Sequence, residues 1–304
     1  MSLESNLAPI VLFVYNRPEY TRRTINALQK NLLAIESDLF IYSDAPKNES
    51  EIGKVKEVRS FIRSISGFKN ITVIEREKNW GLADSIIDGV TNTIKDYKKV
   101  IVLEDDLETS PYFLHFMNEN LAYYKDKKTV WHISGWNYPF NFDVNEDLFL
   151  IRVMSCWGWG TWDDRWQHFE KNTDQLVNDF SKNDIKRFNL DGCYDLWNQV
   201  LANKSKKINT WAIYWYATIF KKNGLCINPV LSYVRNIGLD GTGENCTNNP
   251  YEKFSSLNNS KDIKFPDMLE ENPEMLSIIK NGFKKIRKNY LKRLIKKIRH
   301  FKMT

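Results

Sequence analysis

Apolar and polar positions alternate in blocks along the first hundred residues. Short β-rich apolar runs predict strands at residues 10–15, 39–43, 71–74 and 100–103, and helical spacing predicts helices at residues 18–33, 51–65 and 82–97. Strands and helices that alternate in this way form a mostly parallel sheet covered by helices. Ligands bind such sheets beyond the carboxyl ends of the strands. Polar residues at strand ends are therefore the first candidates for a functional site.

The remainder of the chain has a different pattern. Nine of the ten tryptophans lie between Trp131 and Trp215, strand signals are shorter, and loops are longer. Residues 246–275 are polar, with several Asn and Pro, and predict a loop or linker. Apolar residues within 276–304 recur at three- and four-residue steps among Lys and Arg, which is typical of a basic amphipathic helix.

The net charge of +6 belongs to that last segment. Residues 280–302 contain 11 Lys and Arg and no acidic residue, which leaves 33 basic and 38 acidic residues for 1–279. A mildly acidic body does not suit the wrapping of nucleic acid, so we expect no nucleic-acid partner. The basic helix suits the surface of an anionic bilayer. The alternative is a helix that packs on the domain with its lysines in water.

Three further observations concern the compartment. The four cysteines are widely spaced and form no CxxC pair, which favours reduced thiols. No signal peptide precedes the first strand, and no apolar stretch is long enough to span a membrane. With the basic helix, this pattern predicts a cytoplasmic protein held peripherally on the inner face of the cytoplasmic membrane.

Three consecutive acids, Glu104, Asp105 and Asp106, directly follow the last apolar run. Like charges at one strand end repel each other, and a divalent cation would relieve that repulsion. Carboxylate oxygens suit Mg²⁺ or Mn²⁺, ions that commonly bridge a protein to a diphosphate. The alternative is a water-exposed acidic turn before a helix that starts near Ser110, where acidic residues are favourable.

This run resembles the DxD-type motif of GT-A glycosyltransferases. Several segments in the same order resemble the N-acetylglucosaminyltransferase I family and its bacterial relatives: residues 11–17, Tyr42-Ser43-Asp44, residues 104–108, residues 133–137 and Cys156-Trp157-Gly158-Trp159. The resemblance implies a Rossmann-like GT-A catalytic domain at 1–245. Its donor-binding half would lie at about 1–110 and its acceptor half at about 111–245, and the helix at 276–304 would follow the linker.

The resemblance also implies roles for single residues. Asp106 would bind Mn²⁺ or Mg²⁺ directly, while Glu104 and Asp105 would hold the ribose and the sugar of a nucleotide-diphosphate sugar. Asp44 would accept the uracil N3–H, which favours a UDP-linked donor, although it could equally be a turn residue before Pro46. The full set of expected donor-side residues is Tyr15, Arg17, Asp44, Asn79, Glu104, Asp105, Trp136 and Trp159.

Aromatic rings stack on the apolar faces of sugars, so Trp136, Trp159 and Trp211 are candidates for contact with the acceptor. The family carries its general base in a Trp-Asp-Asp-Trp motif, whereas the nearest segment here, residues 211–215, contains no acid. Asp195, expected in a helix upstream of that segment, is the first candidate for the base. The alternatives are Asp164, Asp240 and Glu244. The glycine-rich segment 236–243 resembles one that orders over bound donor.

The resemblance thus predicts an inverting, metal-dependent glycosyltransferase that acts on a saccharide or lipid-linked saccharide in surface polysaccharide synthesis. Two other classes stay open. One is a nucleotidyltransferase that makes the activated sugar, although no glycine-rich basic phosphate loop follows the first strand. The other is a non-catalytic protein that binds sugar nucleotides at the membrane.

Overall fold

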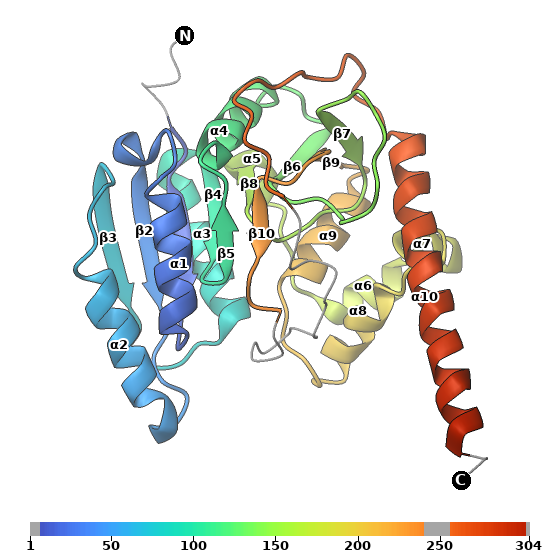
Figure 1. The fold of residues 1–304 in the computed structure, drawn as a ribbon, viewed down its shortest axis with the longest axis horizontal. Coiled ribbons are helices and arrows are strands. Elements are labelled where there is room, and N and C mark those ends of the chain that lie inside the picture. Colours follow the sequence, from blue (N-terminus) through green and yellow to red (C-terminus); the bar gives the residue numbers. More distant parts are fainter. Residues whose placement is uncertain (1–6, 240–255, 302–304) are drawn as a thin grey trace.

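The computed structural model describes residues 7–239 and 256–301, with side chains up to residue 288. The described residues build one mixed eight-stranded sheet of order β3-β2-β1-β4-β8-β6-β9-β7, covered by helices (Figure 1). Its strands are β1 (Ile10–Val14), β2 (Asp38–Ser43), β3 (Asn70–Glu75), β4 (Lys99–Glu104), β6 (Val130–Ser134), β7 (Leu148–Ile151), β8 (Trp159–Trp162) and β9 (Leu225–Pro229). The predicted α/β fold class is confirmed.

A small second sheet pairs β5 (Leu107–Thr109) with β10 (Val234–Asn236) in antiparallel fashion. The helices are α1 (Pro18–Leu28), α2 (Ile52–Ile62), α3 (Leu82–Tyr97), α4 (Phe113–Tyr123), α5 (Asp163–Trp166), α6 (Thr173–Asp179), α7 (Lys182–Phe188), α8 (Trp197–Lys204), α9 (Ala212–Lys221) and α10 (Pro273–Phe301). Two short 3₁₀ turns lie at Ala34–Glu36 and Glu49–Glu51.

The position of β1 explains where a site can form. β1 pairs in parallel with β2 on one side and with β4 on the other. The chain runs outward from β1 through β2 to β3 and then returns across β1 to β4. Connections leave the carboxyl ends of β1 and β4 in opposite directions. These two ends are therefore the switch point, where parallel sheets bind their ligands.

Alternate side chains of β1 enter two different cores. Ile10 and Leu12 are buried on the face covered by α1, α2 and α4. Val11 and Phe13 are buried on the opposite face, under α3 and a group of tryptophans. A strand that is apolar on both faces, as this one is, belongs in the centre of a sheet covered on both sides.

The sheet continues into the second half of the chain. β8 pairs antiparallel with both β4 and β6, and β9 then adds in parallel to β6. The described part of the expected linker also packs on the body. The ring of Phe265 stacks on Tyr123 with centroids 3.9 Å apart, and Glu271 pairs with Arg152 at 2.5 Å. These residues form an ordered loop along the second half of the sheet.

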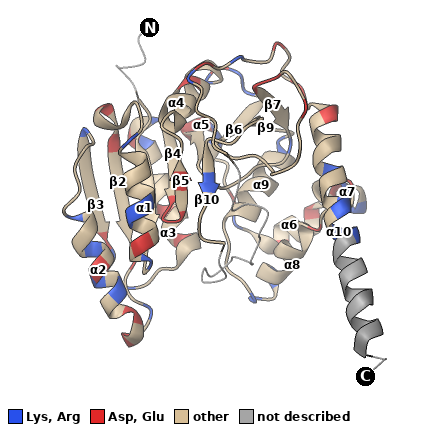
Figure 2. Ribbon diagram, viewed as in Figure 1, with Lys and Arg blue, Asp and Glu red and all other residues tan. Residues whose placement is uncertain are grey.

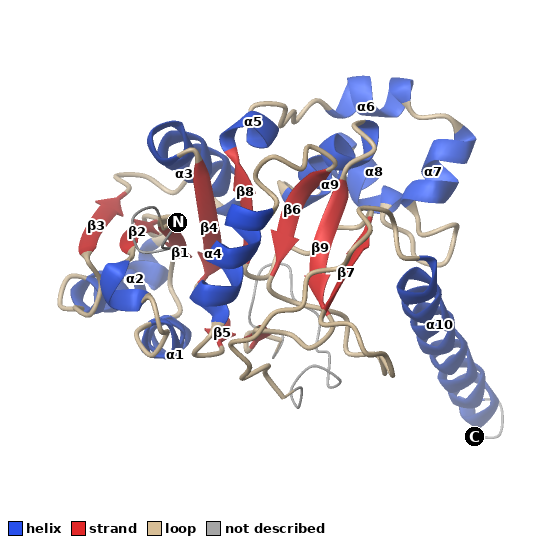
Figure 3. Ribbon diagram, turned by 90° about the horizontal axis from the view of Figure 1, so that it is seen from above, coloured by secondary structure: helices blue, strands red, loops and turns tan. Residues whose placement is uncertain are grey.

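The C-terminal helix α10 divides into two parts. Met275, Leu276 and Ile279 are buried in the body, and the ring of Phe283 packs against Tyr194 with centroids 4.3 Å apart. The later part of the helix extends away from the body (Figures 1 and 3). The expectation that the whole apolar stripe of this helix can face a bilayer is therefore wrong for its first part, because those side chains are already covered. No helix among the described residues is long and apolar enough to cross a membrane.

Candidate functional site

The acidic run ends β4 and turns into β5 at the switch point. Asp105 and Asp106 are 9% and 7% exposed, so this is not the water-exposed turn of the alternative interpretation. The backbone of the run is held from three elements. Thr24 of α1 donates its hydroxyl to the Asp105 carbonyl at 2.8 Å, and the Ile237 N–H after β10 donates to the Asp106 carbonyl at 2.8 Å. The Tyr15 N–H after β1 donates to the Asp105 carboxylate at 3.3 Å.

Burial and mutual repulsion raise the pKa values of two acids in this cluster. Burial, together with the charges of Asp106 and Asp105, raises the pKa of Glu104 well above its usual range. Burial and the charge of Asp106 raise the pKa of Asp105 to about 7, although Arg17 opposes the rise. The Arg17 guanidinium lies 2.9 Å from the Asp106 carboxylate. The site is thus an electrostatically unfavourable group of acids with one arginine beside it, which is a setting that favours a bound cation.

Gly238 brings the chain after β10 against the same two residues. A Cβ atom at this position would lie 2.2 Å from Asp106 Oδ2 and 2.6 Å from Arg17 Nη1. The Gly238 carbonyl also accepts a hydrogen bond from Arg17 at 3.4 Å. The predicted glycine-rich segment therefore starts directly over the acidic run. Beside it, β10 carries a basic residue and β5 an acidic one (Figure 2), and Arg235 pairs with Glu108 at 2.8 Å. Its continuation from residue 240 lies outside the described residues.

Asp44, at the carboxyl end of β2, uses its carboxylate on the chain ahead of α3. Its oxygens accept from the N–H groups of Ala45 at 2.9 Å, Trp80 at 2.9 Å and Gly81 at 2.8 Å. The Trp80 N–H is shared, since it also lies 3.1 Å from the second oxygen. Each Asp44 oxygen therefore already receives two hydrogen bonds from the chain. Asn79 supports the same turn, since its amide donates to the Ala45 carbonyl at 2.7 Å. The structure therefore shows the turn-forming role of both residues.

Sequence reasoning missed Arg59, which joins the ends of β2 and β3. From the last turn of α2, its guanidinium donates to the Arg76 carbonyl at 2.7 Å and to the Asp44 carbonyl at 3.3 Å. Its basic side chain near a helix C-terminus was a faint signal in the sequence. The Tyr15 hydroxyl is also engaged in hydrogen bonds within the protein. It donates to Glu51 and accepts from the Lys47 N–H at 2.9 Å. Burial and the bond to Glu51 raise the pKa of Tyr15.

The donor set at this edge fits a cation that arrives with its own ligands. Within residues 7–239 and 256–288, no three His, Cys, Asp or Glu side chains converge as a ready-made metal cage. Asp106 nevertheless offers a hard carboxylate oxygen beside two further acids. One such oxygen is enough for Mn²⁺ or Mg²⁺ when phosphates and waters complete the coordination. The residues therefore suit a metal carried by a diphosphate ligand better than a resident metal.

The tryptophans chosen from the sequence are mostly core residues. Trp159 is 0% exposed, lies between His132 and Trp211, and stacks on Trp211 with centroids 5.0 Å apart. Trp211 itself is 3% exposed. The expectation that Trp159 and Trp211 contact a sugar is wrong in this structure, because neighbouring rings cover them. Trp136 is also buried, against the half-buried rings of Tyr138 and Trp157.

The candidates for the general base are placed apart from one another. Asp164 follows β8, whose end at Trp162 pairs with Lys99 at the start of β4. It therefore lies at the opposite edge of the sheet, about 17 Å of strand away from the acidic run, and it pairs with Lys128 at 2.7 Å. The structure does not bring it to the site.

Asp195 lies in the loop before α8, not within a helix as expected, because its carboxylate accepts from the Asn198 N–H at 3.2 Å and so caps the helix start. It is exposed and also accepts from the Asn189 amide at 3.2 Å. Asp240 and Glu244 lie outside the described residues.

Residues 10–149 match the family model described as glycosyl transferase family 2. The structure is similar to a mannosyltransferase from Pyrobaculum calidifontis in complex with GDP-Man and Mn²⁺, with TM-score 0.41 and 9% identity, over 72% of this chain and 70% of that one. It is also similar to the galactosyltransferase LgtC, with TM-score 0.37 and 8% identity, over 69% and 70% of the two chains. A search of curated proteins found no match.

Proposed function

We propose that the protein, whose residues 10–149 match the family model described as glycosyl transferase family 2, is a metal-dependent, inverting glycosyltransferase that uses a nucleotide-diphosphate sugar, with UDP as the favoured nucleotide. The observation that carries the proposal is the meeting of Arg17 with Asp105 and Asp106 at the switch point of the sheet. These groups provide a cation site and a positive side chain where a diphosphate has to bind.

Each residue of this edge has a part in the proposal. Asp106 offers the metal-binding oxygen, and Arg17 turns from Asp106 to a phosphate oxygen when donor binds. Glu104 and Asp105 hold hydroxyl groups of the ribose and the donor sugar. A bound Mn²⁺ or Mg²⁺ supplies charge neutralisation for the departing nucleoside diphosphate.

The proposal assigns the base of uracil to the turn built by Asp44. One Asp44 oxygen would take the N3–H group once the Trp80 N–H, which both oxygens now share, bonds to the other oxygen alone. Arg59 holds the same residue through the Asp44 carbonyl. A thymine base carries the same N3–H, so this contact selects a pyrimidine and leaves the choice between UDP and dTDP to other groups.

The acceptor would enter beside the second half of the sheet, and a carboxylate would take the proton from its attacking hydroxyl. Among the four residues considered, Asp195, Asp240 and Glu244 remain candidates for this base. We propose Asp240 or Glu244 ahead of Asp195, since the segment that carries them continues directly from Gly238, which touches Asp106.

We also propose that the later part of α10 holds the enzyme on the inner face of the cytoplasmic membrane, close to a saccharide or lipid-linked acceptor for surface polysaccharide synthesis. Lys284, Lys285, Arg287 and Lys288 are exposed there, next to Ile286, which is 47% exposed. Basic residues beside an apolar one suit an anionic bilayer surface.

The donor assignment is tested by a thermal-shift screen of nucleotide sugars with and without Mn²⁺. We expect UDP-sugars to raise the melting temperature only with Mn²⁺, and Asp106→Ala to abolish the rise. The matched control is Glu108→Gln from the same acidic motif, because Glu108 is bound to Arg235 at 2.8 Å. This variant should keep the ligand-dependent rise. Equal stabilisation by ATP or GDP would contradict the assignment.

Product analysis separates the proposal from its two rivals. A glycosyltransferase releases a nucleoside diphosphate as the sugar is transferred, whereas a nucleotidyltransferase releases pyrophosphate. A binding protein without activity would be stabilised by the donor and Mn²⁺ but would release neither product, even on long incubation in which slow hydrolysis of the donor by water would be detected.

A further inference from the structure

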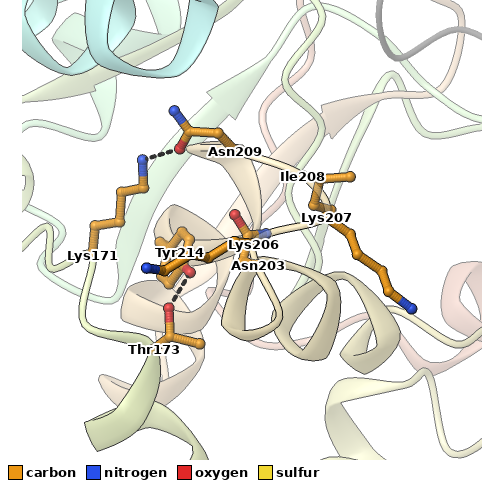
Figure 4. A pocket seen from close by; sticks show the side chains of 8 residues that line it. All are labelled: Lys171, Thr173, Asn203, Lys206, Lys207, Ile208, Asn209 and Tyr214. Carbon is orange, nitrogen blue, oxygen red and sulfur yellow. Dashed lines mark hydrogen bonds between the residues drawn. The ribbon is translucent and has the colours of Figure 1, made fainter.

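A cavity of about 500 Å³ lies in the second half of the molecule, between the starts of α6 and α9 and the end of α8 (Figure 4). Three lysines line it, namely Lys171, Lys206 and Lys207, together with polar side chains such as Asn209. No acidic side chain is among the described residues that line it. Its volume is within the range of small-molecule sites, roughly 300–1,000 Å³.

The backbone at Lys206 is the most unusual feature of this cavity. Lys206 has φ 56°, a left-handed conformation that favours glycine. Its N–H bonds to the Asn203 carbonyl at 3.0 Å, and the Lys207 N–H bonds to the Ala202 carbonyl at 2.9 Å. This pair of hydrogen bonds is the Schellman motif, which ends many helices. The position that Lys206 occupies in this motif is usually Gly. Lysine here costs stability that glycine would not, so Lys206 can be replaced by Gly without loss of stability at this helix end.

The walls of the cavity are built before any ligand arrives. The Asn203 amide donates to the Thr210 hydroxyl at 2.9 Å, and its oxygen accepts from the Thr210 N–H at 3.0 Å. These bonds fix the loop that carries Lys206 and Lys207. On the opposite wall, Thr173 and Tyr214 bond through their hydroxyl groups (Figure 4). A preformed polar wall lowers the entropic cost of binding.

Lys171 connects the lining of the cavity to α3 of the first half of the chain. The Lys171 ammonium lies 2.5 Å from the Asn209 amide oxygen and 3.4 Å from Asp84 in the first turn of α3. That helix begins at the turn held by Asp44. Lys206 and Lys207 make no ion pair with another described side chain, so two positive charges are available beside the proposed acceptor path.

We propose that this cavity binds an anionic group, a carboxylate or a phosphate, carried by the acceptor saccharide; this inference rests on the proposed function. The lysines supply the charge, and Asn209 and Tyr214 supply hydrogen bonds for sugar hydroxyls next to it. Selection among acceptors then follows from charge: a neutral saccharide leaves the lysines without an anion, and an acidic one pairs with them.

The test uses the full chain without donor and without Mn²⁺, so that it does not depend on the donor site. Methyl glucuronide, its neutral counterpart methyl glucoside, glucose 1-phosphate and inorganic phosphate are titrated by calorimetry at low salt. We expect the anionic sugars to bind at least about tenfold more tightly than methyl glucoside, with a difference that shrinks as salt is raised. Comparison of the glucuronide with the sugar phosphate identifies which anion is preferred.

The decisive variant is Lys206→Gly combined with Lys207→Ser. Glycine relieves the left-handed backbone, so the melting temperature should stay level or rise while the preference for anionic sugars is lost. The matched control is Lys204→Gln, which removes a charge from the same helix end outside the cavity, where Lys204 pairs with Asp174. It should keep the preference.

Equal binding of the glucuronide and the glucoside would overturn the inference, as would a preference that survives in the double variant. If UDP-sugars fail to bind but the anionic preference is present and lost on substitution, the cavity is an anion site and only the proposed donor chemistry fails. The two failures are therefore distinguishable.

Discussion

The guanidinium of Arg17 lies 2.9 Å from the carboxylate of Asp106, the residue proposed to bind the metal. Both side chains are nearly buried, with 14% and 10% of their surfaces exposed. In this arrangement Arg17 stands where a divalent cation would be attracted, so the arginine and a free metal ion compete for one carboxylate. When a diphosphate is present the same arginine becomes an attractive partner for it.

Arg17→Ala should therefore change metal binding and donor binding in opposite directions. Removal of the competing cation should tighten the binding of Mn²⁺ alone, while loss of the phosphate partner should weaken the binding of UDP-sugar in the presence of Mn²⁺ by about tenfold or more. Mn²⁺ binding can be followed by electron paramagnetic resonance, and donor binding by calorimetry. Weakening of both by the same factor would contradict competition for Asp106.

Gly238→Ala tests the close approach of the chain after β10. A Cβ atom 2.2 Å from Asp106 Oδ2 cannot be accommodated without movement of that side chain or of the loop. Position 238 is buried, so thermal unfolding has to show that the variant is folded. The folded variant should lose most donor binding and transfer activity.

The matched control for that variant is Gly53→Ala in α2, where an added Cβ meets no atom within 4 Å. Alanine is the better helix former by up to about 1 kcal/mol, so this control should be as stable as the wild type or more stable, with unchanged donor binding. Normal donor binding by Gly238→Ala would show that the contact with Asp106 has no part in the site.

The exposed basic residues of α10 provide a test of membrane attachment that spares the fold. Lys284, Lys285, Arg287 and Lys288 replaced by Gln should reduce sedimentation with vesicles that contain anionic lipid, since each basic residue contributes about 1 kcal/mol near such a surface. Ile279 and Phe283 are left unchanged because they pack on the body. Lys54 and Lys56 of α2, which are exposed as well, serve as the control pair. Equal sedimentation of all variants, or binding to neutral vesicles, would exclude the proposed attachment.

Local signals in the sequence were sufficient to predict the helix and the strand that flank the acidic run. The prediction for α3 matches the observed Leu82–Tyr97, and β4 extends the predicted run by one residue at each end. Both are marked by apolar spacing and by nearby Gly or acidic residues. The prediction for α1 ran too far, to residue 33 instead of Leu28. After Leu28, the Asn31 side chain donates to the Ala27 carbonyl and accepts from the Leu114 N–H. Leu114 is distant in sequence, so local apolar spacing could not show this contact.

Features that depend on pairing across the sheet could not be predicted. Asp164 had the right chemistry for a base, but the antiparallel entry of β8 carries it to the far edge. Trp159 had the right ring for a sugar, but only the tertiary packing shows that His132 and Trp211 cover it. The left-handed backbone at Lys206 could have been predicted from the sequence. The helix before it is followed by polar residues and has no glycine at the position after its end where Gly is usual.

A buried histidine makes a final prediction about pH. His132 on β6 is 0% exposed and is bonded at both ring nitrogens. Its Nε2–H donates to the Ser155 carbonyl at 2.9 Å, so its Nδ1 is the acceptor for the indole N–H of Trp215 at 3.2 Å. Protonation would place a second N–H against that indole in an apolar surrounding. Burial therefore lowers the pKa of His132 to about 3.

The sign of the effect on stability follows from this lowered pKa. In the unfolded chain, His132 takes up a proton near pH 6.5. In the folded chain, it takes up this proton only near pH 3. The contribution of the neutral imidazole is thus complete above pH 6.5 and is lost as the pH falls toward 3, by about 1.4 kcal/mol per pH unit. Between pH 7 and pH 5 the free energy of unfolding should fall by about 2 kcal/mol from this group alone.

His132→Gln isolates that contribution. Glutamine can donate to Ser155 and accept from Trp215 without titrating, although it loses the stacking of His132 on Trp159. The variant should be less stable than the wild type at pH 7, and its additional loss between pH 7 and pH 5 should be smaller by about 2 kcal/mol. Urea unfolding followed by tryptophan fluorescence measures both, because the tryptophan cluster surrounds this residue. A parallel loss in the two proteins would mean that acid acts elsewhere and that His132 is not held neutral by its burial.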